Sequence, residues 1–150
     1  MSIHVKELKK LRKLAKAGAV AQVAALCFDR KGRHKKVLLI TSRDTGRWII
    51  PKGWLMPGVD DAAAALQEAW EEAGVKRGEV SAEPIGRFEY PKVLDTGASI
   101  SVTASVYGVR VRKLSSKYPE AGQRKRIWIT PRKAAKLVQE PELKAILKGF

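Results

Sequence analysis

The sequence predicts a single domain of the α/β (α+β) class, in which helices pack against a mixed sheet. Three observations support this prediction. The chain has 150 residues, of which 45% are hydrophobic and 30% charged, so it can bury one core without disulfides or a structural metal. Alternating apolar segments, which are typical of strands, are interspersed with segments of helical periodicity. We find neither an internal repeat nor a linker that would divide the chain.

The strands and helices follow from these periodicities in chain order. Strands are expected at 20–28, 37–41, 47–50, 85–90, 100–111 and 126–129. Helices are expected at 62–75, 131–138 and 142–147. Thr130 followed by Pro131 is a typical start for the second of these helices.

The first 17 residues are expected to form a basic amphipathic helix or extension that precedes a domain of residues 18–150. Its apolar residues recur every three positions among lysines and are Val5, Leu8, Leu11 and Leu14. We expect this helix to lie on the domain edge, with membrane or nucleic-acid binding as the less favoured alternative. The basic stretch before the apolar run 17–28 also imitates a secretory signal, but the charged turn after the run favours a buried strand.

The charge of the chain is strongly positive and unevenly distributed. Thirty Lys and Arg against fifteen Asp and Glu give a net charge of +15, which predicts polyanionic partners. Residues 59–95 have a net charge of −5, whereas the segments before and after them have +11 and +9. Most charged runs are solvated surface, but an acidic segment in a basic chain also suits a site that holds divalent cations with a phosphate chain.

The cysteine content indicates a reducing compartment. Cys27 is the only cysteine, so an intrachain disulfide and a multi-cysteine zinc site are excluded, and we expect a cytoplasmic protein. No apolar run approaches the ~20 residues that a membrane span needs, so no membrane partner is expected. His4 and His34 have no partner at metal-ligand spacing. The sequence leaves the oligomeric state open.

The helix expected at 62–75 has clear signals at both ends. Asp60 or Asp61 can cap its start, and Gly74 can end it in the left-handed conformation. One apolar face is predicted to contain Leu66, Ala69, Trp70 and Ala73.

Three glutamates are expected to project together from another face of this helix. Glu68, Glu71 and Glu72 are spaced i, i+3 and i+4, so their like charges repel and need an opposite charge nearby. A neighbouring Lys or Arg is one solution. Mg²⁺ is the other, because it is commonly held by one or two carboxylates together with substrate phosphates.

The segment 53–75 resembles the Nudix box. The pattern is glycine, five residues, Glu, seven residues, Arg-Glu, an aliphatic residue, any residue, Glu-Glu, any residue, glycine and an aliphatic residue. The positions that match are Gly53, Glu68, Glu71, Glu72, Gly74 and Val75. Val59 stands where the box has Glu, and Gln67 stands where it has Arg. In the family that arginine helps to orient the metal-binding glutamates, but here one acid and one base are lost together and the net charge is unchanged.

The resemblance extends over roughly residues 18–150, to the diphosphoinositol-polyphosphate-phosphohydrolase-like branch of the superfamily. The resemblance is seen in the segments 47–53 and 122–128 and in the two closing helices. It implies a Nudix-type α/β/α sandwich and a metal-dependent enzyme that hydrolyses a diphosphate linkage in a diphosphoinositol polyphosphate or a dinucleoside polyphosphate. Removal of pyrophosphate from the 5′ end of RNA is an alternative, as is a catalytically weak protein that binds nucleotide or nucleic acid.

The same resemblance implies roles for individual residues. The expected ligands of Mg²⁺ or Mn²⁺ are Glu68, Glu71, Glu72 and the carbonyl of Gly53. The expected catalytic residues are Glu72, Glu71 and, as a base outside the box, Glu120, with Glu89 a weaker candidate. The candidates for substrate phosphates are Arg43, Arg47, Lys52, Arg124, Lys125 and Arg126. Trp54 is expected to pack or to stack on a nucleobase, and Trp128 to be structural.

Overall fold

A computed structural model describes residues 9, 20–31 and 33–150 of the chain. The basic helix expected in the first 17 residues lies outside the described residues, apart from Lys9. Within the described part, no helix is long and apolar enough to cross a membrane.

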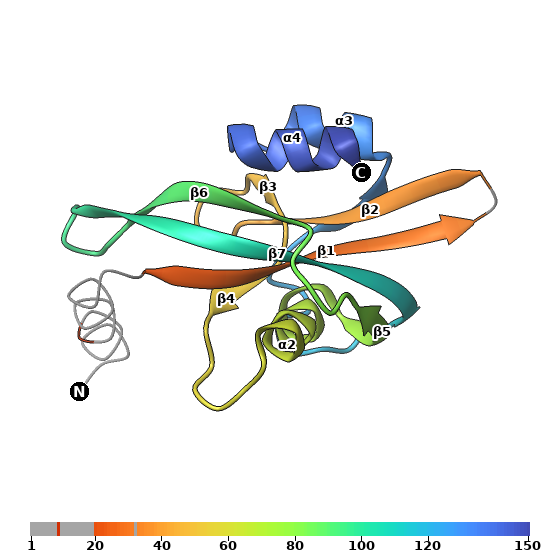
Figure 1. Cartoon of the computed structure of the whole chain (residues 1–150), viewed down its shortest axis with the longest axis horizontal. Coiled ribbons are helices and arrows are strands. Elements are labelled where there is room, and N and C mark those ends of the chain that lie inside the picture. The colour runs from red at the N-terminus through yellow and green to blue at the C-terminus, as the bar shows by residue number, and fades with distance from the viewer. Residues whose placement is uncertain (1–8, 10–19, 32) are drawn as a thin grey trace.

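Four strands precede the first described helix, four more follow it, and two helices end the described chain (Figure 1). The strands are β1 (Ala21–Lys31), β2 (His34–Thr41), β3 (Trp48–Ile49), β4 (Lys52–Trp54), β5 (Val75–Val80), β6 (Gly86–Val93), β7 (Ser99–Leu114) and β8 (Arg126–Ile129). The helices are α2 (Asp61–Ala73), α3 (Pro131–Leu137) and α4 (Pro141–Gly149).

All the described strands belong to one mixed sheet of eight strands, with the order β3-β2-β1-β7-β5 along its main path. The long strands β1 and β7 pair in parallel at its centre, and the other pairings are antiparallel. Beyond that path, β4 pairs with β1, β6 with β7, and β8 with β2. The mixed sheet expected from the sequence is thereby confirmed.

Each face of the sheet packs against helices, which makes the domain a sandwich (Figure 1). Alternate residues of β1 enter the two cores: Val23, Ala25 and Cys27 pack with α2, whereas Ala24 and Leu26 pack with α3 and α4. A strand buried on both faces reads as a continuous apolar run, and this explains the resemblance of this region to a signal sequence.

Two short strands, β4 and β5, escaped the sequence analysis. Lys52–Trp54 contains a glycine and follows Pro51, and it pairs antiparallel with β1. Val75–Val80 is rich in charge, contains Gly78 and pairs with β7 through register shifts. Neither segment has the alternation or the β-branched composition that indicates a strand. Both become strands because they pair with neighbouring strands in the folded domain.

The helix α2 ends slightly earlier than predicted. Gly74 adopts the left-handed conformation, with φ of 74°, and its N–H donates to the carbonyl of Trp70. Val75 therefore starts β5 rather than continuing the helix. Asp60 occupies the predicted N-cap position, but its side chain makes no capping hydrogen bond.

Candidate functional site

The three glutamates that the sequence analysis places on one face of α2 differ in burial. Glu68 and Glu72 are only 8% and 7% exposed, and they lie beside the alanines that pack against the sheet. Glu71 is half-buried and lies on the adjacent row of the helix. The small alanine side chains let α2 approach the sheet closely, and this proximity covers the two glutamates as well.

Gly53 of β4 provides the space into which Glu68 extends. A Cβ at this position would overlap the Glu68 carboxylate, so any residue other than glycine would displace it. At the preceding residue of the strand, the backbone N–H of Lys52 donates to Glu72 Oε1 at 3.4 Å. The pairing of β4 with β1 therefore holds both glutamates against a fixed backbone.

Glu68 and Glu72 form a buried pair of acids. Burial raises the pKa of Glu68 to about 8, helped by a hydrogen bond to Glu72 and by the negative charges around it. Burial also raises the pKa of Glu72, although the nearby Arg124 guanidinium opposes this shift. Two carboxyl groups held this close favour a shared proton, or a cation that replaces it.

Glu71 does not join the pair in this structure. Its Oε1 accepts a hydrogen bond from Gln67 Nε2 at 3.0 Å, one helical turn earlier. Gln67, which replaces the arginine of the box, thus contacts a glutamate, but the outer one. Among the described residues, no three His, Cys, Asp or Glu side chains already converge as a metal-binding group.

A guanidinium from a distant loop stands beside Glu72. Arg124 is 7% exposed, and its Nη2 lies 3.7 Å from Glu72 Oε1 and 3.0 Å from Glu120 Oε1. Its Nη1 donates to the carbonyl of Thr41 at 3.0 Å, which fixes the side chain to the end of β2. The backbone N–H of Glu120 donates to the carbonyl of Glu71, so the loop is also fixed to α2.

The other predicted bases are dispersed. Arg43 reaches Glu120 at 3.4 Å and Gln123 at 3.1 Å, and it remains exposed. Arg47 donates to Thr45 and to Gln139.

Lys52 is different, because burial lowers the pKa of its ammonium group. Its Nζ lies 5.1 Å from the centroid of the Tyr90 ring. Lys125 is exposed.

Arg126 and Glu89 lie in other surroundings. Arg126 donates to the carbonyls of Ala73 and Ser115 and packs on the ring of Tyr118, so it closes the end of α2. Glu89 is exposed on β6 and accepts a hydrogen bond from Thr103 Oγ1. We therefore leave Arg126 out of the proposed substrate site and Glu89 out of the catalytic set.

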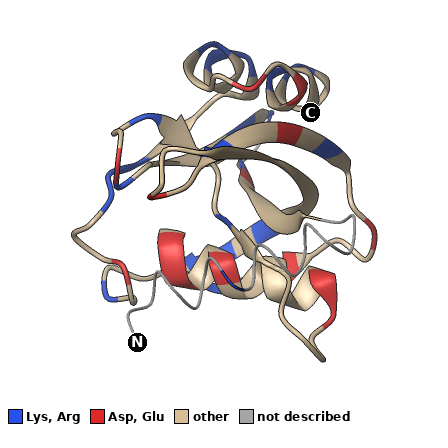
Figure 2. Ribbon diagram, turned by 90° about the vertical axis from the view of Figure 1, so that its left-hand side faces the viewer, with Lys and Arg blue, Asp and Glu red and all other residues tan. Residues whose placement is uncertain are grey.

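The residues present suit a hard divalent cation. Two buried carboxylates of like charge lie against the backbone of a glycine strand, and Mg²⁺ typically takes one or two carboxylates and completes its shell with water and phosphate oxygens. The acids are concentrated on α2, while Lys and Arg recur on α3 and α4 across the sheet (Figure 2). The fold thus separates the acidic helix from the basic helices by the sheet.

Sequence reasoning missed one group of residues near this site. Glu140, in the connection between α3 and α4, acts electrostatically on Lys52 and Tyr90. The Tyr90 hydroxyl donates to Gln22. Glu140, Tyr90 and Gln22 come from three separate segments of the chain and follow no motif, so no spacing could have indicated them.

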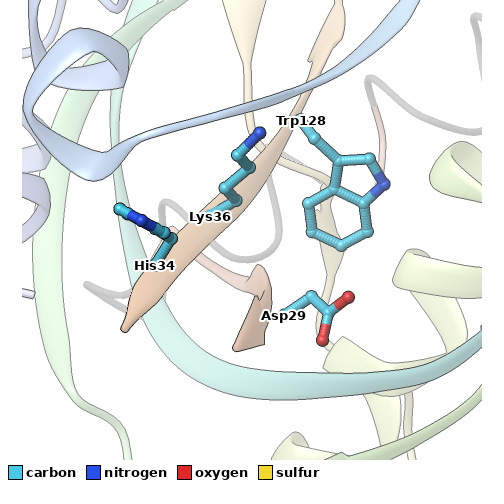
Figure 3. A pocket seen from close by; sticks show the side chains of 4 residues that line it. All are labelled: Asp29, His34, Lys36 and Trp128. Atoms are coloured by element: carbon cyan, nitrogen blue, oxygen red, sulfur yellow. The ribbon is translucent and has the colours of Figure 1, made fainter. Parts of the chain in front are cut away.

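A cavity of about 570 Å³ lies at the other end of the β1–β2 hairpin, and Asp29, His34, Lys36 and Trp128 line it (Figure 3). None of the predicted site residues lines it. Asp29 and Lys36 are paired positions of the two strands. The half-buried Trp128 also packs on the α2-facing core, as expected for a structural residue.

Comparison with known proteins identifies the family. The profile of the NUDIX domain family matches residues 19–149. The chain belongs to the Nudix family. This match confirms the predicted family. The match and the solved structures described below confirm the predicted α/β fold.

Curated Nudix relatives include human diphosphoinositol polyphosphate phosphohydrolase 3-alpha. It is 45% identical over 60 residues, which are 39% of this chain and 36% of that protein. The mouse diphosphoinositol polyphosphate phosphohydrolase 2 is 37% identical over 59 residues, which are 39% of this chain and 33% of that protein. The matched segment thus spans about a third of the length of these relatives.

Solved Nudix structures resemble this chain along most of its length. A C. elegans Ap4A hydrolase superposes with a TM-score of 0.60 at 20% identity, over 87% of this chain and 94% of that chain. The NUDIX domain of Shewanella oneidensis NrtR, solved with ADP ribose, superposes with a TM-score of 0.63 at 15% identity, over 99% and 97%. At these identities the likeness concerns the fold.

Proposed function

We propose that this Nudix protein is a metal-dependent hydrolase that cleaves a diphosphate linkage in a highly phosphorylated substrate. The observation that carries the proposal is the buried Glu68–Glu72 pair, held against Gly53 and flanked by a guanidinium. The relatives named as diphosphoinositol polyphosphate phosphohydrolases, and the fold neighbour named as an Ap4A hydrolase, support the substrate class.

The chain would hold the metal through Glu68 and Glu72, with the Gly53 carbonyl and Glu71 as further ligands. Glu71 would have to leave Gln67 to take part. When bound, the metal would polarise a bridging phosphate and lower the pKa of a water. Lys52 and Arg43 supply positive charge for the phosphate chain beside the acid pair. Arg124 holds Glu72 and Glu120 in fixed positions, which preserves the geometry between turnovers.

Glu120 is the proposed base. Its carboxylate accepts hydrogen bonds from Nε and Nη2 of Arg124 at 3.2 and 3.0 Å, and Arg43 lies nearby. A carboxylate in this position can act as a general base and accept a proton from an attacking water. Arg124 also places this carboxylate beside Glu72 rather than at the loop surface.

The binding-protein alternative is supported by one observation, the absence of the box arginine. Gln67 leaves α2 without its own cation next to the acid pair. A protein that only binds polyanions, however, gains nothing from two buried acids beside its basic surface. Hydrolysis is therefore the hypothesis that the site supports better. We also propose a cytoplasmic location, which the single buried Cys27 supports.

Two measurements test the proposed function. A phosphate-release screen with Mg²⁺ should cover dinucleoside polyphosphates, diphosphoinositol polyphosphates, nucleoside diphosphate sugars and 5′-triphosphorylated RNA, and at least one of the first two should be hydrolysed. Crystals soaked in Mn²⁺ should show density within about 2.0–2.6 Å of two or more of the box carboxylates. Metal bound only elsewhere, or no turnover of any substrate, would refute the proposal.

A further inference from the structure

The cavity at the end of the β1–β2 hairpin is large enough to receive a ligand of its own. Its volume of about 570 Å³ lies within the range of roughly 300–1,000 Å³ that is typical of small-molecule sites. The described side chains around it come from β1, β2 and β8 and are Asp29, His34, Lys36 and Trp128 (Figure 3). No residue of the Nudix box is among them.

Strand pairing brings these side chains to one face of the sheet. Asp29 and Lys36 stand directly opposite each other in the antiparallel pair of β1 and β2, so their side chains share a face. Leu38 lies two residues beyond Lys36, on that same face, and it pairs with Trp128 of β8. Leu38 belongs to the core that packs with α2. The cavity therefore lies on the α2 side of the sheet, beyond the edge of that core.

The polar groups around the cavity are not engaged by the described part of the protein. Within that part, Asp29, Lys36 and Trp128 make no side-chain hydrogen bond or ion pair, although Asp29 and Trp128 are half-buried. Opposite charges at paired positions of two strands usually attract each other. Figure 3 shows instead the Lys36 side chain extending away from the Asp29 carboxylate. A carboxylate, an ammonium group and an indole ring are thus available to one ligand.

This combination of groups suits one kind of planar ring better than others. The face of an indole ring stacks on a nucleobase. An ionised carboxylate only accepts hydrogen bonds, and its two oxygens can accept two parallel N–H groups. Guanine presents such a pair on one edge, its ring N1–H and its 2-amino group, whereas adenine presents only its 6-amino group beside acceptors. A lysine beside the ring suits an attached phosphate.

We propose that this cavity is a second ligand site, which binds a guanine nucleotide. The base would stack on Trp128 and pair with Asp29, and the phosphate would lie beside Lys36 and His34. The proposal goes beyond the proposed hydrolysis and does not depend on it, because the cavity contains neither the acid pair nor any other residue of the box. Its test therefore needs neither metal nor turnover.

Calorimetry with GMP, AMP, IMP and guanosine, in the presence of a metal chelator, measures the expected selectivity. GMP should bind about tenfold or more tightly than AMP, because AMP lacks the pair of donors. IMP, which keeps N1–H but lacks the 2-amino group, should bind with an intermediate affinity. Guanosine should bind more weakly than GMP. Equal affinities for GMP and AMP, or no binding of GMP, would overturn the proposal.

Substitutions separate the contacts to the base from those to the phosphate. Asp29→Asn should weaken GMP binding by about tenfold or more and should strengthen binding of xanthosine monophosphate, because the amide can donate to the 2-carbonyl of xanthine. Lys36→Ala should reduce the affinity for GMP to that for guanosine and leave guanosine binding unchanged. The control is Glu79→Gln, which removes a carboxylate outside the cavity and should change nothing. Wild-type affinity for GMP in Asp29→Asn would refute the pairing with the base.

Nuclear magnetic resonance locates the bound nucleotide. The indole N–H signal of Trp128, assigned through its loss in Trp128→Phe, should shift when GMP is added without metal. The backbone N–H signal of Lys36 should shift with it. Shifts confined to the backbone N–H signals of Lys52 and Gly53 would place the nucleotide at the acid pair and overturn the proposed second site.

Discussion

The helix α2 and the loop 115–125 meet at the same site but supply opposite parts of it. The helix contributes Glu68 and Glu72, four residues apart and buried with like charge. The loop contributes Glu120 and the guanidinium of Arg124, which is bonded to the end of β2. A short contiguous motif can therefore provide the acids, whereas the cation that holds them depends on the tertiary fold.

This comparison also accounts for the missing arginine of the box. Gln67 on α2 contacts only Glu71, while Arg124 lies beside Glu72 and Glu120. In this chain the guanidinium nearest the acid pair comes from the loop rather than from the helix. Substitutions in α2 and in the loop 115–125 therefore test the two contributions separately.

The largest effect is expected from Glu72→Gln. Loss of a metal ligand that stabilises charge in the transition state should lower kcat by about 100-fold or more, since several kcal/mol of such stabilisation is lost. The free energy of unfolding should stay level or rise slightly, because the substitution relieves repulsion from Glu68. Steady-state kinetics and urea unfolding measure the two quantities.

The matched control is Glu71→Gln on the same helical turn. Glu71 is turned toward Gln67, so its removal should cost less activity than removal of Glu72. If Glu71→Gln were the more damaging change, the outer glutamate would be the main ligand and the buried pair would be structural.

The next effect concerns the loop. Arg124→Lys should lower kcat/KM by about 10- to 100-fold, the range found when a group that orients a metal ligand is lost. Lysine keeps the charge but cannot bridge Glu72 and Glu120 with a planar fork while reaching Thr41. Mn²⁺ affinity, measured by electron paramagnetic resonance, should fall as well.

Loss of the Arg124 ion pairs should cost more folding stability than loss of an ordinary surface ion pair. Arg124→Ala leaves two acids without their cation in a buried place, and it should destabilise the fold by about 3–5 kcal/mol. The control is Arg112→Ala, which breaks an exposed pair with Glu79 and should cost about 0–1 kcal/mol. Equal losses in the two variants would mean that Arg124 is no more than a surface residue.

The predictability of the fold follows the same division between local and distant interactions. The long strands and the helices could be predicted because alternation and helix ends such as Gly74 are local signals. The strands β4 and β5 could not, since Gly53 and Gly78 weaken their local preference and only pairing with β1 and β7 defines them.

The site could be predicted only in part, for a related reason. The motif indicates Glu68 and Glu72, but it does not show that Glu71 turns away or that Arg124 replaces Gln67 beside the acid pair. Side-chain direction depends on which groups the fold brings near. Glu140 could not be found from the sequence, because only the structure shows that one of its carboxylate oxygens is buried without a hydrogen-bond partner among the described residues.

The smallest effect is expected from restoring the box itself. Val59 is 42% exposed and Gln67 is also exposed, so an arginine at 67 would be solvated rather than trapped beside an apolar group. Because Arg124 already stands beside Glu72, Gln67→Arg alone should change kcat/KM by less than about threefold, the range of an exposed ion pair. Adding Val59→Glu should give a positive coupling, on the order of 1 kcal/mol or less, in a double-mutant cycle. A tenfold gain from Gln67→Arg alone would show that the loop guanidinium does not replace the missing arginine, and additive effects would show that the two departures arose independently.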